Sequence, residues 1–119
     1  MQYMLLIYDQ EKAMEGKSQE EMASVMASWF KYTDELEKSG KMSGGGALQP
    51  TATATTIRAS EGGILTSDGP FAETKEQLGG YYVIDADDLD EAIEGAGKMP
   101  HVAEGGAVEV RPIMEFDKP

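Results

Sequence analysis

The chain has 119 residues, with 22 acidic against 10 basic side chains and no cysteine, which gives a net charge of −12. This length predicts a single domain over residues 1–119 that buries a core without disulfide bonds. The charge excludes nucleic acid as a partner and disfavours an anionic membrane surface, because no basic stripe offsets it. The lack of cysteine excludes thiol nucleophiles and thiolate metal sites.

The first strong pattern is the apolar run at residues 2–8, which predicts a strand. Both alternating faces of this run are apolar, so we expect the strand to be buried on both sides. The run is too short to span a bilayer and lacks the basic flank of a secretion signal. We therefore expect a cytoplasmic protein that does not associate with membranes.

Residues 18–39 carry the pattern of the main helix. Ser18 and Glu21 have the spacing of a capping box, and apolar residues then recur with the 3.6-residue period of a helix. Gly40 is a natural residue to follow the C-terminus of this helix.

Three consecutive glycines follow at residues 44–46. The triplet lacks the Lys and the Ser or Thr of a phosphate-binding loop and does not lead into a helix, so we interpret it as a flexible turn into an edge strand. Residues 51–59 favour a strand. Residues 61–63 then favour a hairpin turn that leads into the partner segment 64–66.

The last third of the chain predicts a strand at 79–85, a helix from about Asp87 to about Met99, and a final strand at 107–116. The acids at the start of this helix complement the helix dipole and need no ligand.

The order strand, helix, hairpin, strand, helix, strand predicts an α+β fold. It is the order of a ferredoxin-like split βαβ sheet with two helices, here with an inserted hairpin. Two helices cover only one face of such a sheet. Since the first strand is apolar on both faces, we expect a second subunit on the other face, and hence a homodimer.

The leading candidate for a functional site is the turn-rich, charge-dense loop at residues 66–81. Gly69 and Pro70 fix a tight backbone path, and loops on a rigid scaffold often carry sites. Asp68 is interpreted either as a general base or as a cap that accepts backbone N–H bonds of the turn. Phe71 is the apolar residue of the loop and is expected to anchor it to the mouth of a barrel.

Four further residues are candidates by type. His101 is the only histidine, and it is either a proton carrier or a group that caps helix carbonyls or lies in solvent. Arg111 shares a strand face with Glu109, so it either binds a carboxylate or phosphate group bidentately or forms an internal ion pair. Tyr81 is either a ligand contact or a core or interface residue. One histidine among scattered acids gives thin support for a transition metal.

Segments along the whole chain resemble one bacterial family. These segments are residues 1–8, 47–54, 66–81 and 108–112. They resemble the DGPF-domain proteins of the YCII-related superfamily. The resemblance implies a ferredoxin-like, dimeric α+β barrel whose two sheets enclose a cavity. Members often accompany extracytoplasmic-function sigma factors, and related proteins are proposed to use a His–Asp pair near the first helix. This chain has no histidine there, so Asp68 and His101 are the candidates by residue type.

Two functions are compatible with these patterns. The first is a small-molecule-binding protein, or a cofactor-free acid–base enzyme, with a cavity between the sheet and the 66–81 loop. Its catalytic residues would be Asp68 and His101, without a metal. Its ligand contacts would be Gly69, Pro70, Phe71, Tyr81, Glu109 and Arg111. The second is a non-catalytic interaction module in a sigma-factor or stress-response pathway.

Overall fold

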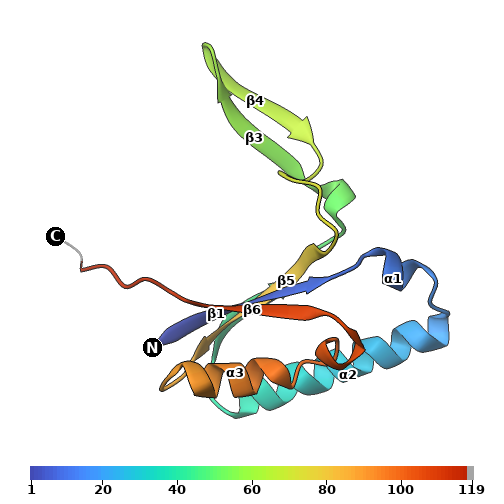
Figure 1. Cartoon of the computed structure of the whole chain (residues 1–119), viewed down its shortest axis with the longest axis vertical. Helices are drawn as coiled ribbons and strands as arrows, with labels where there is room; N and C mark the ends of the chain where they lie inside the picture. Colours follow the sequence, from blue (N-terminus) through green and yellow to red (C-terminus); the bar gives the residue numbers. More distant parts are fainter. Residues whose placement is uncertain (118–119) are drawn as a thin grey trace.

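The main sheet is four-stranded and antiparallel in the computed structural model, which describes residues 1–117; residues 118–119 of the predicted domain lie outside the described chain. Its strands are β1 (Gln2–Asp9), β2 (Met42–Ala47), β5 (Gln77–Asp85) and β6 (Ala107–Pro112). They lie in the order β2-β5-β1-β6. The helices α2 (Gln19–Lys38) and α3 (Leu89–Gly97) cover one face of this sheet (Figure 1). The ferredoxin-like arrangement predicted from the sequence is confirmed.

Between β2 and β5 the chain leaves the sheet and forms a hairpin of β3 (Thr55–Ser60) and β4 (Gly63–Asp68). We call residues 55–71, which comprise this hairpin and the turn after it, the arm. Three short helical elements were not predicted. They are α1 (Lys12–Glu15) and the 3₁₀ turns η1 (Thr51–Thr53) and η2 (Val102–Glu104).

The interpretation of the glycine triplet as a turn is wrong, because it lies inside the edge strand β2. A Cβ on Gly45 would lie 2.8 Å from the carbonyl oxygen of Tyr81 and 3.0 Å from the ring of Tyr82. Strand β2 thus approaches β5 so closely that only glycine fits at this position. The ring of Tyr81 lies over Gly46, where a Cβ would be 3.6 Å away from it.

Both long helices begin with side-chain caps. The Ser18 hydroxyl accepts a hydrogen bond from the Glu21 N–H at 3.1 Å, and the Glu21 carboxylate accepts one from the Ser18 N–H at 3.2 Å. The predicted capping box is confirmed, and the bond from the Ser18 N–H lowers the pKa of Glu21. At the start of α3, the Asp88 carboxylate accepts from the Glu91 N–H at 2.9 Å.

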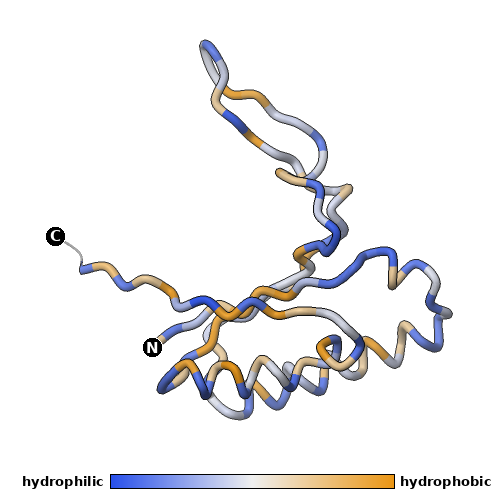
Figure 2. The backbone as a smooth tube through the Cα atoms, viewed as in Figure 1, coloured by the Kyte–Doolittle hydropathy of each residue, from blue (hydrophilic) through white to orange (hydrophobic). Residues whose placement is uncertain are grey.

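The core lies between the helices and the covered face of the sheet. Its buried members are Tyr3, Leu5, Tyr32, Tyr82, Ile84, Ala86, Ala92, Ala96 and Met99. The Tyr32 hydroxyl donates to the Gly95 carbonyl at 2.8 Å and so joins α2 to α3. Burial, with a further contribution from the neighbouring Tyr82, raises the pKa of Tyr32 to about 12. Figure 2 shows the hydrophobic segments concentrated along the main sheet, with further ones on the arm.

The other face of the sheet has no helix on it among the described residues, and the arm rises on that side (Figure 1). The radius of gyration is 16.7 Å, whereas a compact domain of this length has about 13–14 Å. Strand β6 ends at Pro112, earlier than predicted, and one further hydrogen bond follows it, from the Ile113 N–H to the Gln2 carbonyl at 2.9 Å, where β1 begins. No helix of the described chain is long and apolar enough to cross a membrane.

Candidate functional site

The uncovered face of the main sheet, which we call the open face, carries two rows of side chains set by the strand register. One row runs across the four strands as Gly46, Tyr81, Leu6 and Glu109. The next row runs as Gly44, Val83, Met4 and Arg111. Residues that pair directly across antiparallel strands lie on the same face. The face is therefore apolar at its centre, with one cation and one carboxylate on β6 and a second carboxylate, Asp85, at the end of β5.

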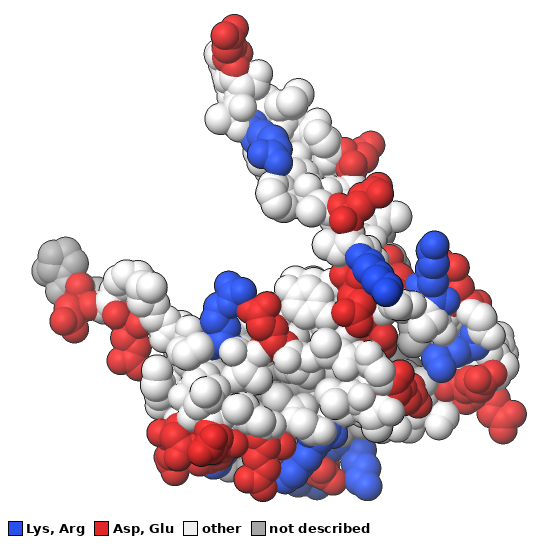
Figure 3. All heavy atoms as spheres, in the orientation of Figure 1, with Lys and Arg blue, Asp and Glu red and all other residues white. Residues whose placement is uncertain are grey.

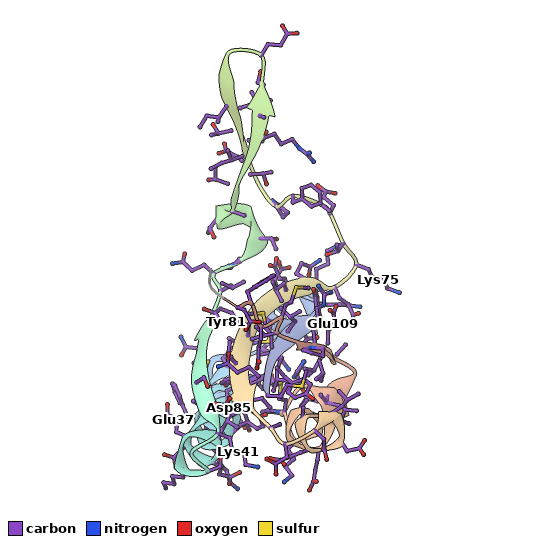
Figure 4. The ribbon with its side chains drawn as sticks, turned by 90° about the vertical axis from the view of Figure 1, so that its left-hand side faces the viewer. Glu37, Lys41, Lys75, Tyr81, Asp85 and Glu109 are labelled. Atoms are coloured by element: carbon purple, nitrogen blue, oxygen red, sulfur yellow. The ribbon has the colours of Figure 1, made fainter. Side chains whose placement is uncertain are left out.

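Arg111 and Glu109 form an ion pair on this face. Their side chains are 69% and 40% exposed, so the guanidinium remains accessible from the open side. The internal pair that the sequence offered as one alternative is what the structure shows. Tyr81 and Glu109 both lie near the base of the arm (Figure 4).

The arm has two distinct sides. Its register pairs Ile57 with Thr66 and Ala59 with Ile64, and it pairs Thr55 with Asp68 on the same side. Ile57 and Ile64 are 63% and 72% exposed, so this apolar side is uncovered. We call it the apolar side of the arm.

The opposite side of the arm carries Arg58 and Leu65. The Arg58 guanidinium lies 4.9 Å from the centre of the Phe71 ring, a distance at which a cation–π contact forms. Phe71 is 73% exposed. Its ring lies against Arg58 of the arm, and its expected role as an anchor to the mouth of the barrel stays a prediction.

The turn that contains Asp68 closes through the backbone. The Gly69 N–H donates to the Ala54 carbonyl at 2.7 Å, and the Thr56 hydroxyl donates to the Gly69 carbonyl at 2.8 Å. Gly69 has φ +101°, which an L side chain rarely adopts. Pro70 follows as an exposed residue. The Asp68 carboxylate is exposed and accepts no hydrogen bond from residues 1–117, so a capping role finds no support.

A set of hydrogen bonds at the base of the arm was not predicted. The Glu11 carboxylate accepts from the N–H and the hydroxyl of Thr51, at 2.8 and 3.0 Å. The Gln77 side chain accepts from the Glu11 N–H at 2.9 Å and donates to the Thr74 carbonyl at 2.6 Å. Glu11 is far in sequence from both Thr51 and Gln77, so no local pattern could have identified these contacts.

His101 lies on the helical side of the sheet. Its ring is 5% exposed and stacks beside Trp29 with 5.2 Å between ring centres. Its Nε2 is 2.9 Å from the Ala107 carbonyl, to which it donates, and its Nδ1 is buried without a partner among the described residues. The structure therefore does not bring His101 together with Asp68.

The expected cavity between the sheet and the 66–81 loop stays a prediction. Asp68 and Arg111 are both solvent-exposed, on the arm and on the open face respectively. Grooves occur elsewhere, for example beside residues 112–115 and between α2 and α3. Within residues 1–117 no cluster of acids and histidine has the geometry of a metal site.

A ferredoxin-like α+β domain with an uncovered sheet face and a projecting hairpin is the class of protein defined by this geometry. The chain belongs to the YCII-related domain family, whose sequence profile matches residues 1–117. The family resemblance drawn from the sequence segments is thus confirmed.

The chain is similar to one curated sequence and to one solved structure. It is 40% identical to an uncharacterised protein of Rhizobium meliloti (strain 1021), over 98% of this chain and 94% of that protein. It also resembles the structure of a 5-chloro-2-hydroxyhydroquinone dehydrochlorinase (TftG) from Burkholderia phenoliruptrix AC1100, solved with 2,5-dihydroxybenzoquinone. That structure has a TM-score of 0.57 and 17% identity, and the match covers 98% of this chain and 96% of the other. The likeness shows a shared fold.

Proposed function

We propose that the protein binds a small, planar, oxygenated or anionic molecule on the open face. The observation that carries this proposal is the Arg111–Glu109 ion pair beside the apolar centre of the open face. A guanidinium presents several N–H donors in one plane, which suits a carboxylate or adjacent carbonyl oxygens. Glu109 orients the guanidinium, and the remaining donors of Arg111 are free to meet the ligand.

The apolar centre of the open face would receive the body of the ligand. Leu6 lies between Tyr81 and Glu109 in one row, and Met4 lies next to Arg111 in the neighbouring row. A planar ring placed there contacts apolar side chains while its oxygens reach the guanidinium. A few polar groups in a mostly apolar pocket are typical of small-molecule sites.

Acid–base chemistry at this site would depend on Asp68. His101 is buried on the other side of the sheet, where it cannot reach a ligand on the open face. The ligand named with the fold neighbour, 2,5-dihydroxybenzoquinone, is planar and carries oxygens at its rim. It is therefore a reasonable first probe for this chain.

We infer that a second copy of the chain covers the open face. Met4, Leu6 and Val83 form an apolar surface that no helix covers within the described chain. Uncovered apolar faces of this kind mark interaction surfaces. A homodimer would bury this face and turn it into the wall of a cavity, as in an α+β barrel.

The binding proposal is tested by titration calorimetry with 2,5-dihydroxybenzoquinone and, separately, benzoate. We expect Arg111→Ala to weaken binding by roughly tenfold or more, because a charged hydrogen bond contributes about 1.5–3 kcal/mol. Lys38→Ala is the matched control, since it removes one positive charge on the helical side. Equal affinities of wild type and Arg111→Ala would overturn the proposal.

A second candidate function is a non-catalytic interaction module in a sigma-factor pathway. The observation that favours it is the pair Met26 and Phe30, one turn apart on α2 and 46% and 67% exposed. This function predicts that Phe30→Gln abolishes co-purification with a coexpressed extracytoplasmic-function sigma factor. It also predicts no binding of either small-molecule probe.

A further inference from the structure

The arm packs little against the rest of residues 1–117. Its two strands pair extensively with each other, whereas no comparable packing joins them to another element of the described chain. The side chains of Ile57, Ile64 and Leu65 are all more than half exposed. An isolated two-stranded hairpin is marginally stable in water. The apolar side of the arm is therefore expected to lie against a surface that a single chain does not supply.

The arm is nonetheless held in a defined direction. Glu11 and Gln77 bind the segments that enter and leave it, through Thr51 and Thr74. It rises from one end of the main sheet on the side away from the helices (Figure 1). The arm thus rises at an angle from the open face (Figure 1), and we call the region between these two surfaces the corner.

The low charge of the arm and of the centre of the open face suits a second copy of the same chain as the occupant of this corner. Two chains of net charge −12 repel each other, so they associate best through surfaces that carry little charge. The hairpin 55–68 contains one basic and two acidic residues, and the open face carries the neutral Arg111–Glu109 pair, with Asp85 at the end of β5. Figure 3 shows charged side chains on the helical side and around the base of the arm, while most of the arm above its base is uncharged.

We propose that the arm of each chain packs its apolar side against the open face of a second copy, and so completes the partner's ligand site. This inference rests on the homodimer proposed above. A two-fold axis makes the contact twice, because each chain offers one arm and one open face.

The residue that the arm would deliver is Asp68. It lies on the apolar side, in register with Thr55, and its carboxylate has no partner within residues 1–117. Packing of Ile57 and Ile64 on the partner would carry Asp68 into the same interface. The Asp68 carboxylate would then lie beside a ligand site that contains Arg111. It would supply the proton acceptor there, because His101 lies on the other side of the sheet. The proton acceptor and the anion-binding group of one site would then come from different chains.

The chain contains no cysteine, so engineered thiols can test this contact by cross-linking. A mass-tagged chain with Leu6→Cys is mixed with an untagged chain that carries Ile64→Cys, and a bismaleimide is added. We expect a cross-linked heterodimer, in a yield several-fold above that of Leu65→Cys in place of Ile64→Cys. Leu65 is the matched control because it is adjacent but on the opposite side of the arm. Ile57→Cys is a second probe of the apolar side, in case one variant does not fold.

Each outcome separates the two proposals. Equal yields from Ile64→Cys and Leu65→Cys would overturn the placement of the arm. So would intrachain cross-linking of the double variant Leu6→Cys/Ile64→Cys, because the arm would then fold back onto its own sheet. A normal cross-link without binding of 2,5-dihydroxybenzoquinone or benzoate would instead overturn the ligand proposal and leave the arm contact standing.

Discussion

At the scale of the residue, Gly45 fixes the distance between β2 and β5. The two strands meet so closely there that an added Cβ would lie 2.8 Å from a backbone oxygen, which cannot rotate away as a side chain could. Gly44, its neighbour on the same strand, has nothing within 4 Å of the corresponding position. The two glycines therefore have different roles although the sequence shows them as equivalent.

We expect Gly45→Ala to lower the free energy of unfolding by about 1–3 kcal/mol, as overpacking does in tight sites. Gly44→Ala is the control and is expected to change it by less than about 0.5 kcal/mol. Urea unfolding of both variants measures the difference. Equal losses would show that the close approach of the two strands is not what requires glycine.

Asp68 and Arg111 are candidate site residues whose roles depend on how the elements and chains are arranged. Each is exposed in a single chain, and neither contacts the other. Their residue types suit proton transfer and anion binding, but chemistry requires that they converge on one ligand. This convergence is a question of how elements and chains are placed.

At the scale of the element, the arm depends on its base. Glu11 accepts two hydrogen bonds from Thr51, at the point where the chain leaves for β3. The Glu11 carboxylate thus links the loop after β1 to the segment that enters the arm through two hydrogen bonds. A rigid base is what would allow an uncovered hairpin to keep one direction.

We expect Glu11→Ala to release the arm without unfolding the main sheet. Amide protons of β3 and β4 should exchange several-fold faster, because local opening costs less when its base is untied. Hydrogen exchange of β1 and β5 should stay unchanged. Glu15→Ala in α1 is the control, since Glu15 is exposed and outside this network. Unaltered exchange in the arm would show that Glu11 does not hold it.

At the scale of the whole molecule, the distribution of apolar surface is the main feature. The helices bury one face of the sheet, while the opposite face and the arm remain uncovered in a single chain. The extents of 51 × 49 × 20 Å describe a flat, angular body rather than a compact one. Such a shape is expected of a subunit whose second layer comes from another copy.

We expect wild-type protein to sediment as a dimer and Leu6→Asp to sediment as a monomer. A carboxylate at the centre of the open face would have to be buried unpaired in the dimer, which costs several kcal/mol. Phe30→Asp places the same charge on the exposed side of α2 and is the control, expected to remain dimeric. A dimeric Leu6→Asp would locate the dimer interface elsewhere.

Local patterns in the sequence were sufficient to predict the elements near which they occur. The period of α2 with its Ser18–Glu21 box, the alternation of β5 and the hairpin around residues 61–63 are confirmed. Each depends on residues within a few positions of one another, so the chain encodes it locally. The order of these elements along the chain then predicted the ferredoxin-like sheet.

Other features depend on contacts between distant segments. The glycine triplet was misread because the need for glycine comes from β5, far along the chain. His101 and Asp68 were paired by residue type, yet the sheet separates the interior position of one from the exposed position of the other. The base of the arm was missed because Glu11 and Thr51 meet only after folding.

The sequence by itself therefore determined the fold class, the family and the apolar character of both faces of β1. These properties follow from composition, periodicity and motifs, which are readable along the chain. Only the tertiary structure decided which candidate residues share a surface, because register and packing set the side of the sheet on which each one lies. It placed Arg111, Glu109 and Tyr81 on the open face, His101 behind it, and Asp68 on an arm that projects from the sheet.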